Sequence, residues 1–388
     1  MEVIVFGGNH HNTLGVIRSL GREGVFPVVL LHDEGNSGNR GLLKSKYIKY
    51  YKLVSNCIEG IDYLNNLAPS NEKRIIICCS DDASSCIDEN RNILSKHYLI
   101  PCCAKQGEIT RLMNKQVMGD YSKQVGFFVP SDVVIKNGII PEGVVYPCIT
   151  KPIKSIYGSK DDIKVCGNRE ELEKTLRNTK SPQIQAQHFI AKEFEYQLIG
   201  CSLNGGEEII IPGRSRIITQ PTCTNTGFLK YEHLDGTEPI EECKRFIRGI
   251  KYSGLFSMEF LRGIDRKDYF MEINFRNDGN SICVTEAGVN LSFLWYAYNS
   301  GLDWKSIIPS DIKEIYVMPE FTELGMWYIG DISFARMIKE FKLSDVYMDF
   351  ATDDPKPTHG KFDFIICFFK YLIKKPARKF LIAFNIKK

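Results

Sequence analysis

Carboxylate, amide and guanidinium side chains alternate with apolar ones in residues 254–280, a spacing that can hold a metal ion. The segment predicts two β-strands joined by a polar turn. Alternate residues of a strand point to one face, so Glu272, Asn274 and Arg276 share a face of the second strand. Glu259 lies on the matching face of the first strand. The sequence therefore predicts a hairpin with one metal-binding face.

The turn decides how the two glutamates face each other. With a turn over residues 264–268, centred between Asp265 and Arg266, Glu259 lies opposite Glu272. Opposed side chains of this kind are roughly 5 Å apart, and like charges at that distance repel. A divalent cation between them converts the repulsion into attraction. Carboxylate and amide oxygens suit Mg²⁺, which takes its other ligands from water and substrate phosphates.

Arg276 lies one step further along the same face, where it can neutralise charge on a transferred phosphoryl group. The alternative interpretation is an amphipathic hairpin whose acidic face is only solvated. The residues of this segment alone leave both interpretations open.

The N-terminal residues predict a parallel α/β lobe at positions 1–105. A strand, a helix at residues 13–22 and a second strand form a β-α-β unit that lacks the G-x-G-x-x-G dinucleotide fingerprint. A further apolar strand at residues 74–79 precedes Asp81 and Asp82, which we expect to cap the next helix.

Lys151 occupies a position that suits an anion. We predict one helix over residues 108–125 that contains Lys115, and an apolar strand that ends at Lys151. A lysine at the end of an apolar strand has little reason to point inward unless an anion meets it. Lys160 lies in the loop that follows. Surface lysines are the alternative for each.

Arg214 and Arg216 are two residues apart on a predicted strand, so both point the same way. Two guanidinium groups on one face suit a carboxylate or an acyl phosphate. An exposed basic edge strand is the alternative.

The order of these motifs resembles the ATP-grasp superfamily, which includes biotin carboxylase and D-alanine–D-alanine ligase. The resemblance rests on E-x-L followed by E-x-N-x-R in the hairpin, on K-P after an apolar strand, and on Q-x-F-I at residues 187–190. It implies an α/β ATP-grasp fold with an N-terminal parallel lobe, a small lid lobe and a C-terminal antiparallel α+β lobe. The implied domains are 1–105, 106–308 with the lid at about 150–190, and a C-terminal extension at 309–388.

The resemblance also implies a role for each site residue. Those implied for ATP are Lys115, Lys151 and Lys160 at the phosphates, Gln187, His188, Phe189 and Ile190 around the adenine edge, Glu195 near the ribose, and Leu261 against the adenine ring. Those implied for Mg²⁺ are Glu259, Glu272 and Asn274. Arg276 is implied in catalysis, and we add Arg214 and Arg216.

The implied activity is an ATP- and Mg²⁺-dependent carboxylate–amine ligase that works through an acyl phosphate. An enzyme of the same fold with another acceptor, a nucleotide-binding module without turnover, and an interaction protein remain as alternatives. The expected partners are small-molecule carboxylate and nucleophile substrates, and a homodimer stays open.

Composition narrows the function classes. The chain has 388 residues, 43% hydrophobic and 25% charged, as in a soluble globular protein with two or three subdomains. A net charge of +3 gives no reason to expect nucleic acid as a partner. Thirteen cysteines without C-x-x-C spacing predict reduced thiols in the cytoplasm. We find neither a signal peptide nor a membrane span.

The C-terminal residues 360–388 are aromatic, aliphatic and basic, and Asp363 is their only acid. Phe364, Phe368, Tyr371 and Leu372 predict one face of a helix that Pro376 interrupts. Such a helix can lie on an anionic membrane surface or pack on the body of the protein, and packing is the more frequent outcome.

Overall fold

A computed structural model of the chain describes all residues except 33–39, 69, 153–162, 180, 222–226, 359–363 and 375–388. The chain forms two compact units. Unit 1 comprises Met1–Met113, Tyr196–Met258 and Ile273–Lys388, and unit 2 comprises Asn114–Glu195 and Glu259–Glu272. The domain boundaries expected from the sequence stay a prediction.

The N-terminal part of unit 1 is a five-stranded sheet in the order β3-β2-β1-β4-β5. Every neighbouring pair in it is parallel. The strands are β1 (Val3–Gly8), β2 (Val28–His32), β3 (Tyr50–Val54), β4 (Arg74–Cys78) and β5 (Tyr98–Leu99). The predicted parallel α/β lobe is therefore confirmed.

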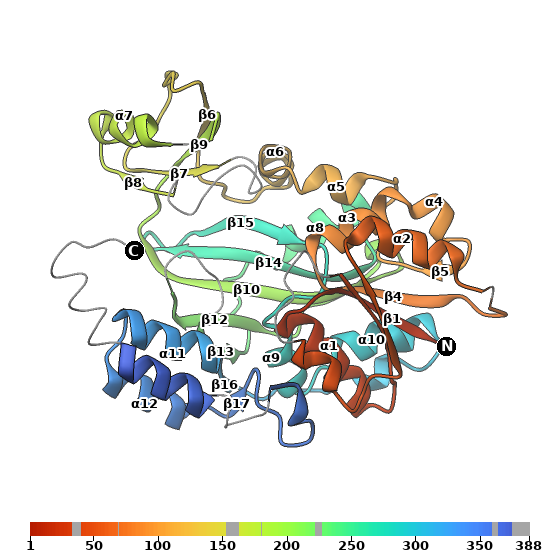
Figure 1. Ribbon diagram of the computed structural model, residues 1–388. Coiled ribbons are helices and arrows are strands. Elements are labelled where there is room, and N and C mark those ends of the chain that lie inside the picture. The colour runs from red at the N-terminus through yellow and green to blue at the C-terminus, as the bar shows by residue number, and fades with distance from the viewer. Residues whose placement is uncertain are drawn as a thin grey trace. The chain divides into compact units, whose positions relative to one another are not determined.

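Helices cover both faces of this sheet, as a parallel sheet requires (Figure 1). They are α1 (His11–Arg22), α2 (Cys57–Asn66), α3 (Asp81–Glu89) and α4 (Arg91–Leu94). Successive residues of β1 point to opposite faces. Val5 packs in the cluster that contains Leu20 of α1, and Phe6 packs in the one that contains Ile61 of α2.

The predicted cap of α3 is wrong. Ser80 is the N-cap, and its hydroxyl accepts the N–H of Ala83 at 3.2 Å. A capping side chain must sit one residue before the helix to reach that N–H. Asp81 and Asp82 instead lie in the first turn, where their negative charges oppose the positive end of the helix dipole.

A second sheet has the order β15-β14-β10-β12-β13-β16-β17, with β11 paired to β10. Its strands are β10 (Lys192–Leu203), β11 (Glu208–Ile210), β12 (Arg214–Thr219), β13 (Phe228–Glu232), β14 (Gly254–Gly263), β15 (Asp268–Asn274), β16 (Ile315–Met318) and β17 (Val346–Tyr347). The β12–β13 and β13–β16 pairs are antiparallel, and β16–β17 is parallel. The chain passes between the two units within β10, β14 and β15.

The remaining helices of unit 1 are α5 (Glu108–Leu112), α8 (Ile240–Ile250), α9 (Ser281–Glu286), α10 (Leu291–Asn299), α11 (Glu320–Ile329) and α12 (Phe334–Leu343). Helices α9 and α10 contribute Cys283, Leu294 and Trp295 to the same hydrophobic core as Val5 of β1. One core therefore joins the first sheet to residues nearly 300 positions later in the chain.

Unit 2 contains a small sheet in the order β6-β9-β7-β8. Its elements are α6 (Lys115–Val125), β6 (Asp132–Lys136), β7 (Cys148–Pro152), β8 (Val165–Cys166), α7 (Arg169–Asn178) and β9 (Gln183–His188). Ile135, Cys148 and Leu172 form its core.

The single helix predicted over residues 108–125 is wrong, because α5 and α6 are separate. Asn114 between them has an extended ψ of 119°, and its side chain accepts the N–H groups of Gln116 and Val117 at 3.0 and 3.2 Å. A capping asparagine of this kind starts a new helix. Lys115 is consequently the first residue of α6.

The predicted hairpin forms as β14 and β15, but its turn is shorter than predicted. Gly263 accepts the N–H of Arg266 at 2.8 Å and donates to Lys267, and Arg266 has a φ of 61°. This is a three-residue loop closed by a left-handed residue. The predicted register, with Glu259 opposite Glu272, places Phe260 opposite Met271. The ring of Phe260 instead lies 5.8 Å from that of Phe270, so the register near the turn differs from the prediction by one residue.

A buried carboxylate, Asp354, helps to attach the C-terminal extension to the first lobe. Asp354, 1% exposed, accepts bonds from Arg18 Nε at 3.2 Å, Ser45 Oγ at 2.7 Å and the N–H of Lys46 at 3.0 Å. The Arg18 side chain is 2% exposed, so this is a buried ion pair.

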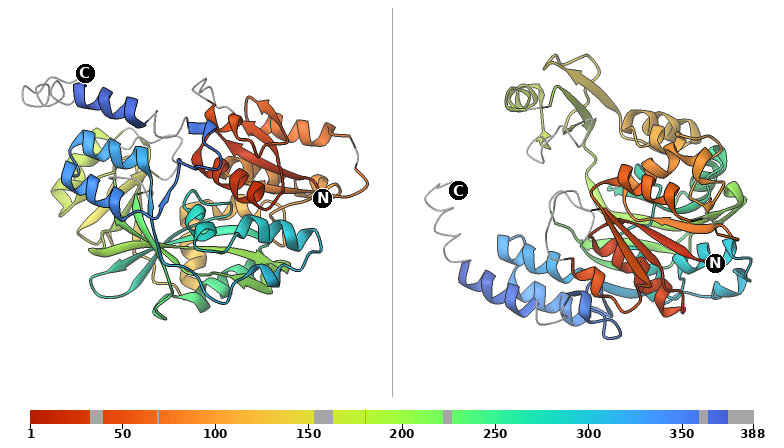
Figure 2. Two further views of the ribbon diagram at one scale, coloured as in Figure 1. Left: turned by 90° about the horizontal axis from the view of Figure 1, so that it is seen from below. Right: turned by 45° about the vertical axis from the view of Figure 1, so that its right-hand side comes forward.

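Residues 364–374 form a helix beside α11 and α12 (Figure 2). Phe368 stacks on Trp327 with 5.3 Å between ring centroids, and Tyr371 stacks on Tyr328 at 4.3 Å. Packing of this helix on the protein body is therefore confirmed. Leu372, expected on the same helical face as these residues, is 47% exposed.

In the part of the chain that the structure describes, no helix has the length and apolar character needed to cross a membrane. The cysteines described there are all free thiols, most of them buried.

Candidate functional site

Lys115 begins α6, and this position is electrostatically unusual. No acidic residue lies in the first turn of that helix. The N-terminus of a helix carries a partial positive charge, so a lysine there adds like charge to like. A phosphate or another anion relieves this repulsion.

Lys151 on β7 lies close to Lys115. Its Nζ donates to Oε1 of Gln187 on the neighbouring strand at 2.9 Å. Burial first, and then the positive charge of Lys115, hold the pKa of Lys151 below its usual value, whereas Glu272 and Glu195 act to raise it. Unit 2 thus brings together five of the predicted site residues.

Asp132 on β6 is a member of this cluster that sequence reasoning missed. It lies opposite Gln187 in the sheet, accepts Gln185 Nε2 at 2.8 Å, and is 3.6 Å from Lys123 Nζ. Its charge also raises the pKa of Lys151. No sequence signal marks Asp132, because its place depends on how β6 pairs with β9.

The linker after β9 already uses two of its backbone donors. The N–H of His188 donates to Ser131 at 2.7 Å, and the N–H of Phe189 donates to Pro147 at 2.8 Å. The carbonyl groups of this linker are therefore the better candidates for an adenine edge. Glu195, further along, forms a 2.7 Å ion pair with Lys192.

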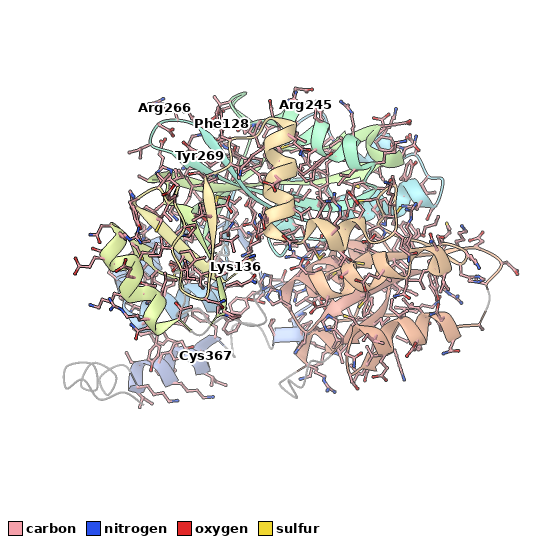
Figure 3. The ribbon with its side chains drawn as sticks, turned by 90° about the horizontal axis from the view of Figure 1, so that it is seen from above. Phe128, Lys136, Arg245, Arg266, Tyr269 and Cys367 are labelled. Carbon is pink, nitrogen blue, oxygen red and sulfur yellow. The ribbon has the colours of Figure 1, made fainter. Side chains whose placement is uncertain are left out.

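In unit 2 the hairpin is held against the segment that follows α6. Phe127 stacks on Phe270 with 4.9 Å between ring centroids, and the N–H of Phe270 donates to the carbonyl of Phe128 at 2.8 Å. Figure 3 shows Phe128 beside Tyr269 at this place. This contact fixes α6 relative to the strand that carries Glu272. Glu259 and Glu272 are half-buried, and Leu261 is 8% exposed.

Asn274 and Arg276 belong to unit 1 and are bonded to each other. The Oδ1 atom of Asn274 accepts Arg276 Nη2 at 3.2 Å, and its Nδ2 atom donates to Ser257 at 3.3 Å. Arg276 Nε also donates to Asp81 Oδ1 at 2.7 Å. Asp278 lies 3.7 Å from the guanidinium and accepts Ser257 Oγ at 2.7 Å. Asn274 is thereby oriented by partners on both sides.

His10, which belongs to none of the sequence motifs, lies near Arg276. His10 caps α1 and its ring lies 3.8 Å from that of His11. Burial and the positive charge of Arg276 lower the pKa of His10. Burial beside His10 lowers the pKa of His11 to about 3. Both imidazoles are therefore neutral at physiological pH.

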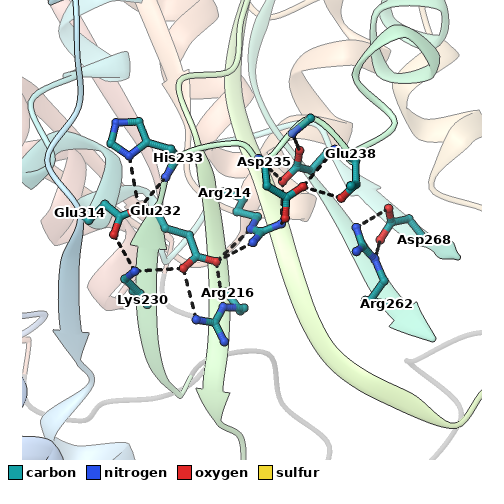
Figure 4. Close-up of polar contacts among 12 residues, drawn as sticks. Arg214, Arg216, Lys230, Glu232, His233, Asp235, Glu238, Arg262, Asp268 and Glu314 are labelled. Carbon is teal, nitrogen blue, oxygen red and sulfur yellow. Dashed lines mark hydrogen bonds and ion pairs between the residues drawn. The ribbon is translucent and has the colours of Figure 1, made fainter. Parts of the chain in front are cut away.

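The two predicted substrate arginines differ sharply (Figure 4). Arg214 is 8% exposed and forms ion pairs with Glu232, Asp235 and Glu238 at 2.7 to 2.9 Å. Arg216 pairs with Glu232 at 2.8 Å, and a third of its side chain is exposed. Of the two, Arg216 is the one that solvent or a ligand can reach.

Two further predictions concern the ligands. Lys160 lies outside the described residues. Among the residues that are described, no three His, Cys, Asp or Glu side chains converge to hold a metal ion. The expected Mg²⁺ ligands include only two side chains of these types, Glu259 and Glu272, together with the amide of Asn274. Mg²⁺ usually takes its remaining ligands from water.

A parallel α/β lobe, a small sheet with its lysine cluster, and a larger mainly antiparallel sheet that ends in an acidic hairpin together define the ATP-grasp fold. The chain has this fold, as the sequence predicted. No protein-family model and no curated protein matches the sequence, but solved structures do.

The chain is similar to N5-carboxyaminoimidazole synthetase from Staphylococcus aureus complexed with ADP, with 16% identity, 86% of each chain covered and a TM-score of 0.63. L-amino acid ligase from Bacillus licheniformis is 14% identical, with 81% of this chain and 78% of that chain covered and a TM-score of 0.60. Biotin carboxylase from Campylobacter jejuni is 16% identical, with coverage of 81% and 74% and a TM-score of 0.58.

Proposed function

We propose that this protein is an ATP- and Mg²⁺-dependent ligase that joins a carboxylate substrate to an amine or another nucleophile through an acyl phosphate. The single observation that carries the proposal is the cluster of Lys151, Lys115 and Glu272 in unit 2. The ligase chemistry is supported by analogy with the enzymes that share the fold.

The lysine cluster fits a nucleoside triphosphate. Two ammonium groups and the N-terminus of α6 are close enough to repel one another, and burial adds to the cost of charging Lys151. A bound polyphosphate offsets both the repulsion among these positive charges and the cost of charging the buried Lys151. We assign Lys115, Lys151 and Lys160 to the phosphates, Gln187, His188, Phe189 and Ile190 to the adenine side, with Glu195 and Leu261 nearby.

The hairpin fits a magnesium ion. Glu259 and Glu272 are half-buried carboxylates on adjacent strands, and Asn274 is two residues beyond Glu272 on β15. We assign these three residues to Mg²⁺. The Asn274 Oδ1 atom accepts one bond from Arg276 and has a second lone pair for the ion. The same amide group would therefore hold Arg276 beside the metal ion.

Bound ATP would supply the phosphoryl group that activates the carboxylate. The chain's own contribution is to hold charges in place, since phosphoryl transfer depends mainly on positioning and electrostatics. Arg276 stabilises the charge that develops on the phosphoryl oxygens. Arg216 binds the substrate carboxylate, and Arg214 holds Glu232 and the strand behind it.

The test is ADP release with pools of carboxylates and amines, in wild type and Glu272→Gln. We expect the variant to lose turnover, by about 10²-fold or more, because one metal ligand is removed. Glu173→Gln is the matched control: Glu173 is an exposed glutamate on α7, 3.0 Å from Arg169. Unchanged ADP release in Glu272→Gln refutes the metal assignment.

The alternatives give different results in the same assay. Mg²⁺-dependent ATP binding without ADP release from any pool indicates a nucleotide-binding module without turnover. ADP release that requires a carboxylate but no amine indicates another acceptor. We propose the cytoplasm as the compartment, where ATP is available and thiols stay reduced.

A further inference from the structure

The helix at residues 364–374 has an unusual distribution of apolar side chains, which lie on two opposite faces. The face toward the protein body carries Phe364, Phe368 and Tyr371, packed against the cluster of Leu324, Met326 and Trp327. A surface helix normally needs only this one apolar stripe.

The opposite face is also apolar, and it is exposed. Ile365, Phe369 and Ile373 are spaced four residues apart and are 47%, 56% and 76% exposed. Ile366 and Leu372, 36% and 47% exposed, lie on either side of this stripe. We call these five residues the outer stripe. Contiguous apolar surface of this kind marks an interaction site.

The charges around the outer stripe have one sign. Lys370 and Lys374 are exposed and lie on one flank of it. No acidic residue occurs from 364 to 388, whereas Lys375, Arg378, Lys379, Lys387 and Lys388 continue the basic sequence. Between Lys379 and Lys387 the sequence is apolar except for Asn385. The partner that complements this surface is therefore apolar and negatively charged.

We propose that the outer stripe docks on an anionic lipid surface, with the helix lying in the plane of the headgroups. Eleven residues span about 16 Å at 1.5 Å each, which is too short to cross a bilayer and suits an interfacial helix. Each lysine near an anionic bilayer contributes about 1 kcal/mol, which is about fivefold in the partition coefficient.

A second copy of the chain fits this surface less well. Two outer stripes face to face would bring Lys370 and Lys374 of both copies together without any acid on either helix. The packed inner face explains how the helix keeps its structure before it meets lipid, since Trp327 and Tyr328 hold it in place. The inference does not depend on the proposed ligase activity.

The experiment is cosedimentation of the full chain with vesicles of phosphatidylcholine alone and of an equimolar mixture with phosphatidylglycerol. We expect binding to the mixed vesicles only, weakened by salt. Phe369→Glu combined with Ile373→Glu should lower the partition coefficient at least about tenfold, since two apolar side chains are lost and two like charges are added. Lys370→Glu combined with Lys374→Glu should do the same.

Ile58→Glu is the control, because Ile58 is a 70% exposed isoleucine on α2. It should bind like wild type, and all variants should keep the wild-type melting temperature because the altered side chains are exposed. Absence of binding to the mixed vesicles overturns the proposal. So does binding that Phe369→Glu/Ile373→Glu leaves unchanged. A wild-type dimer in light scattering that this variant dissociates, without lipid binding, assigns the stripe to a second copy instead.

Discussion

The guanidinium of Arg276 is fixed by the carboxylate of Asp81, with 2.7 Å between Nε and Oδ1. Asp81 lies in the first turn of α3, 195 residues earlier in the chain. The Arg276 side chain is 17% exposed and that of Asp81 is 55% exposed. An arginine held in this way has little freedom left to lose when a substrate arrives, which is the condition for electrostatic catalysis.

Replacement of Arg276 by alanine should reduce ADP release about 10²- to 10³-fold, with little change in the KM for ATP. The reason is that a charge aimed at the transferred phosphate acts mainly in the transition state. Steady-state kinetics measure both constants. Arg245→Ala is the control, since Arg245 on α8 is an exposed arginine (labelled in Figure 3) paired with Glu242 at 2.7 Å. A variant that changes KM alone would assign Arg276 to ground-state binding.

ATP binding should take up protons at alkaline pH through Lys151. Its pKa is lowered, so it loses its proton at a lower pH than a free lysine. Phosphate favours the ammonium form and raises that pKa again, so ATP affinity should fall as pH rises. Titration calorimetry in two buffers of different ionisation enthalpy measures the uptake. Lys151→Arg keeps its charge throughout and should remove the pH dependence; if uptake persists in this variant, another group is responsible.

Arg214→Met should destabilise the protein by about 3–5 kcal/mol. Glu232 and Glu238 are 6% and 7% exposed, and the substitution leaves their carboxylates without their main cation. Arg216→Met should cost about 1 kcal/mol or less, because its side chain is 33% exposed. Urea unfolding measures both. Equal losses would show that the two arginines support the strand alike.

Stability should fall as pH rises because of Glu323. This side chain is fully buried beside Glu340, and burial raises its pKa to about 9 from a usual value of 4.5. The folded state therefore binds this proton more tightly, so the contribution to stability is full below the usual pKa and is lost as pH approaches the folded value. Glu323→Gln cannot ionise and should flatten the decline in urea unfolding between about pH 6 and about pH 8.5. An unchanged slope would exclude Glu323.

The fold and the main functional hypothesis could be predicted from the sequence because their signals are local and ordered. Adjacent residues encode an apolar strand such as Val3–Gly8. They also encode a helix such as α7, through the N-cap Asn168 and the helical periodicity that follows it. Lys115 and Lys151 were also found by position along the chain, and unit 2 does bring them together.

The features that the sequence did not predict depend on single polar residues or on partners that are distant in the sequence. Asn114 separates two helices, but an asparagine within a stretch of helical periodicity does not by itself indicate a helix boundary. The ion pairs of Arg214 with Glu232, Asp235 and Glu238 were not foreseen, and its contact with a substrate stays a prediction. Asp132 gained its neighbours from strand pairing across 55 positions, which no short motif records.

The carboxylate of Asp354 also has a consequence for biosynthesis. Arg18 is synthesised 336 residues before its buried partner. At about 5–20 residues per second, about 17 to 67 seconds separate the two. The first lobe therefore reaches its final stability only after Asp354 has been synthesised, and a chaperone that shields α1 during this interval would protect the lobe while its buried arginine lacks that carboxylate.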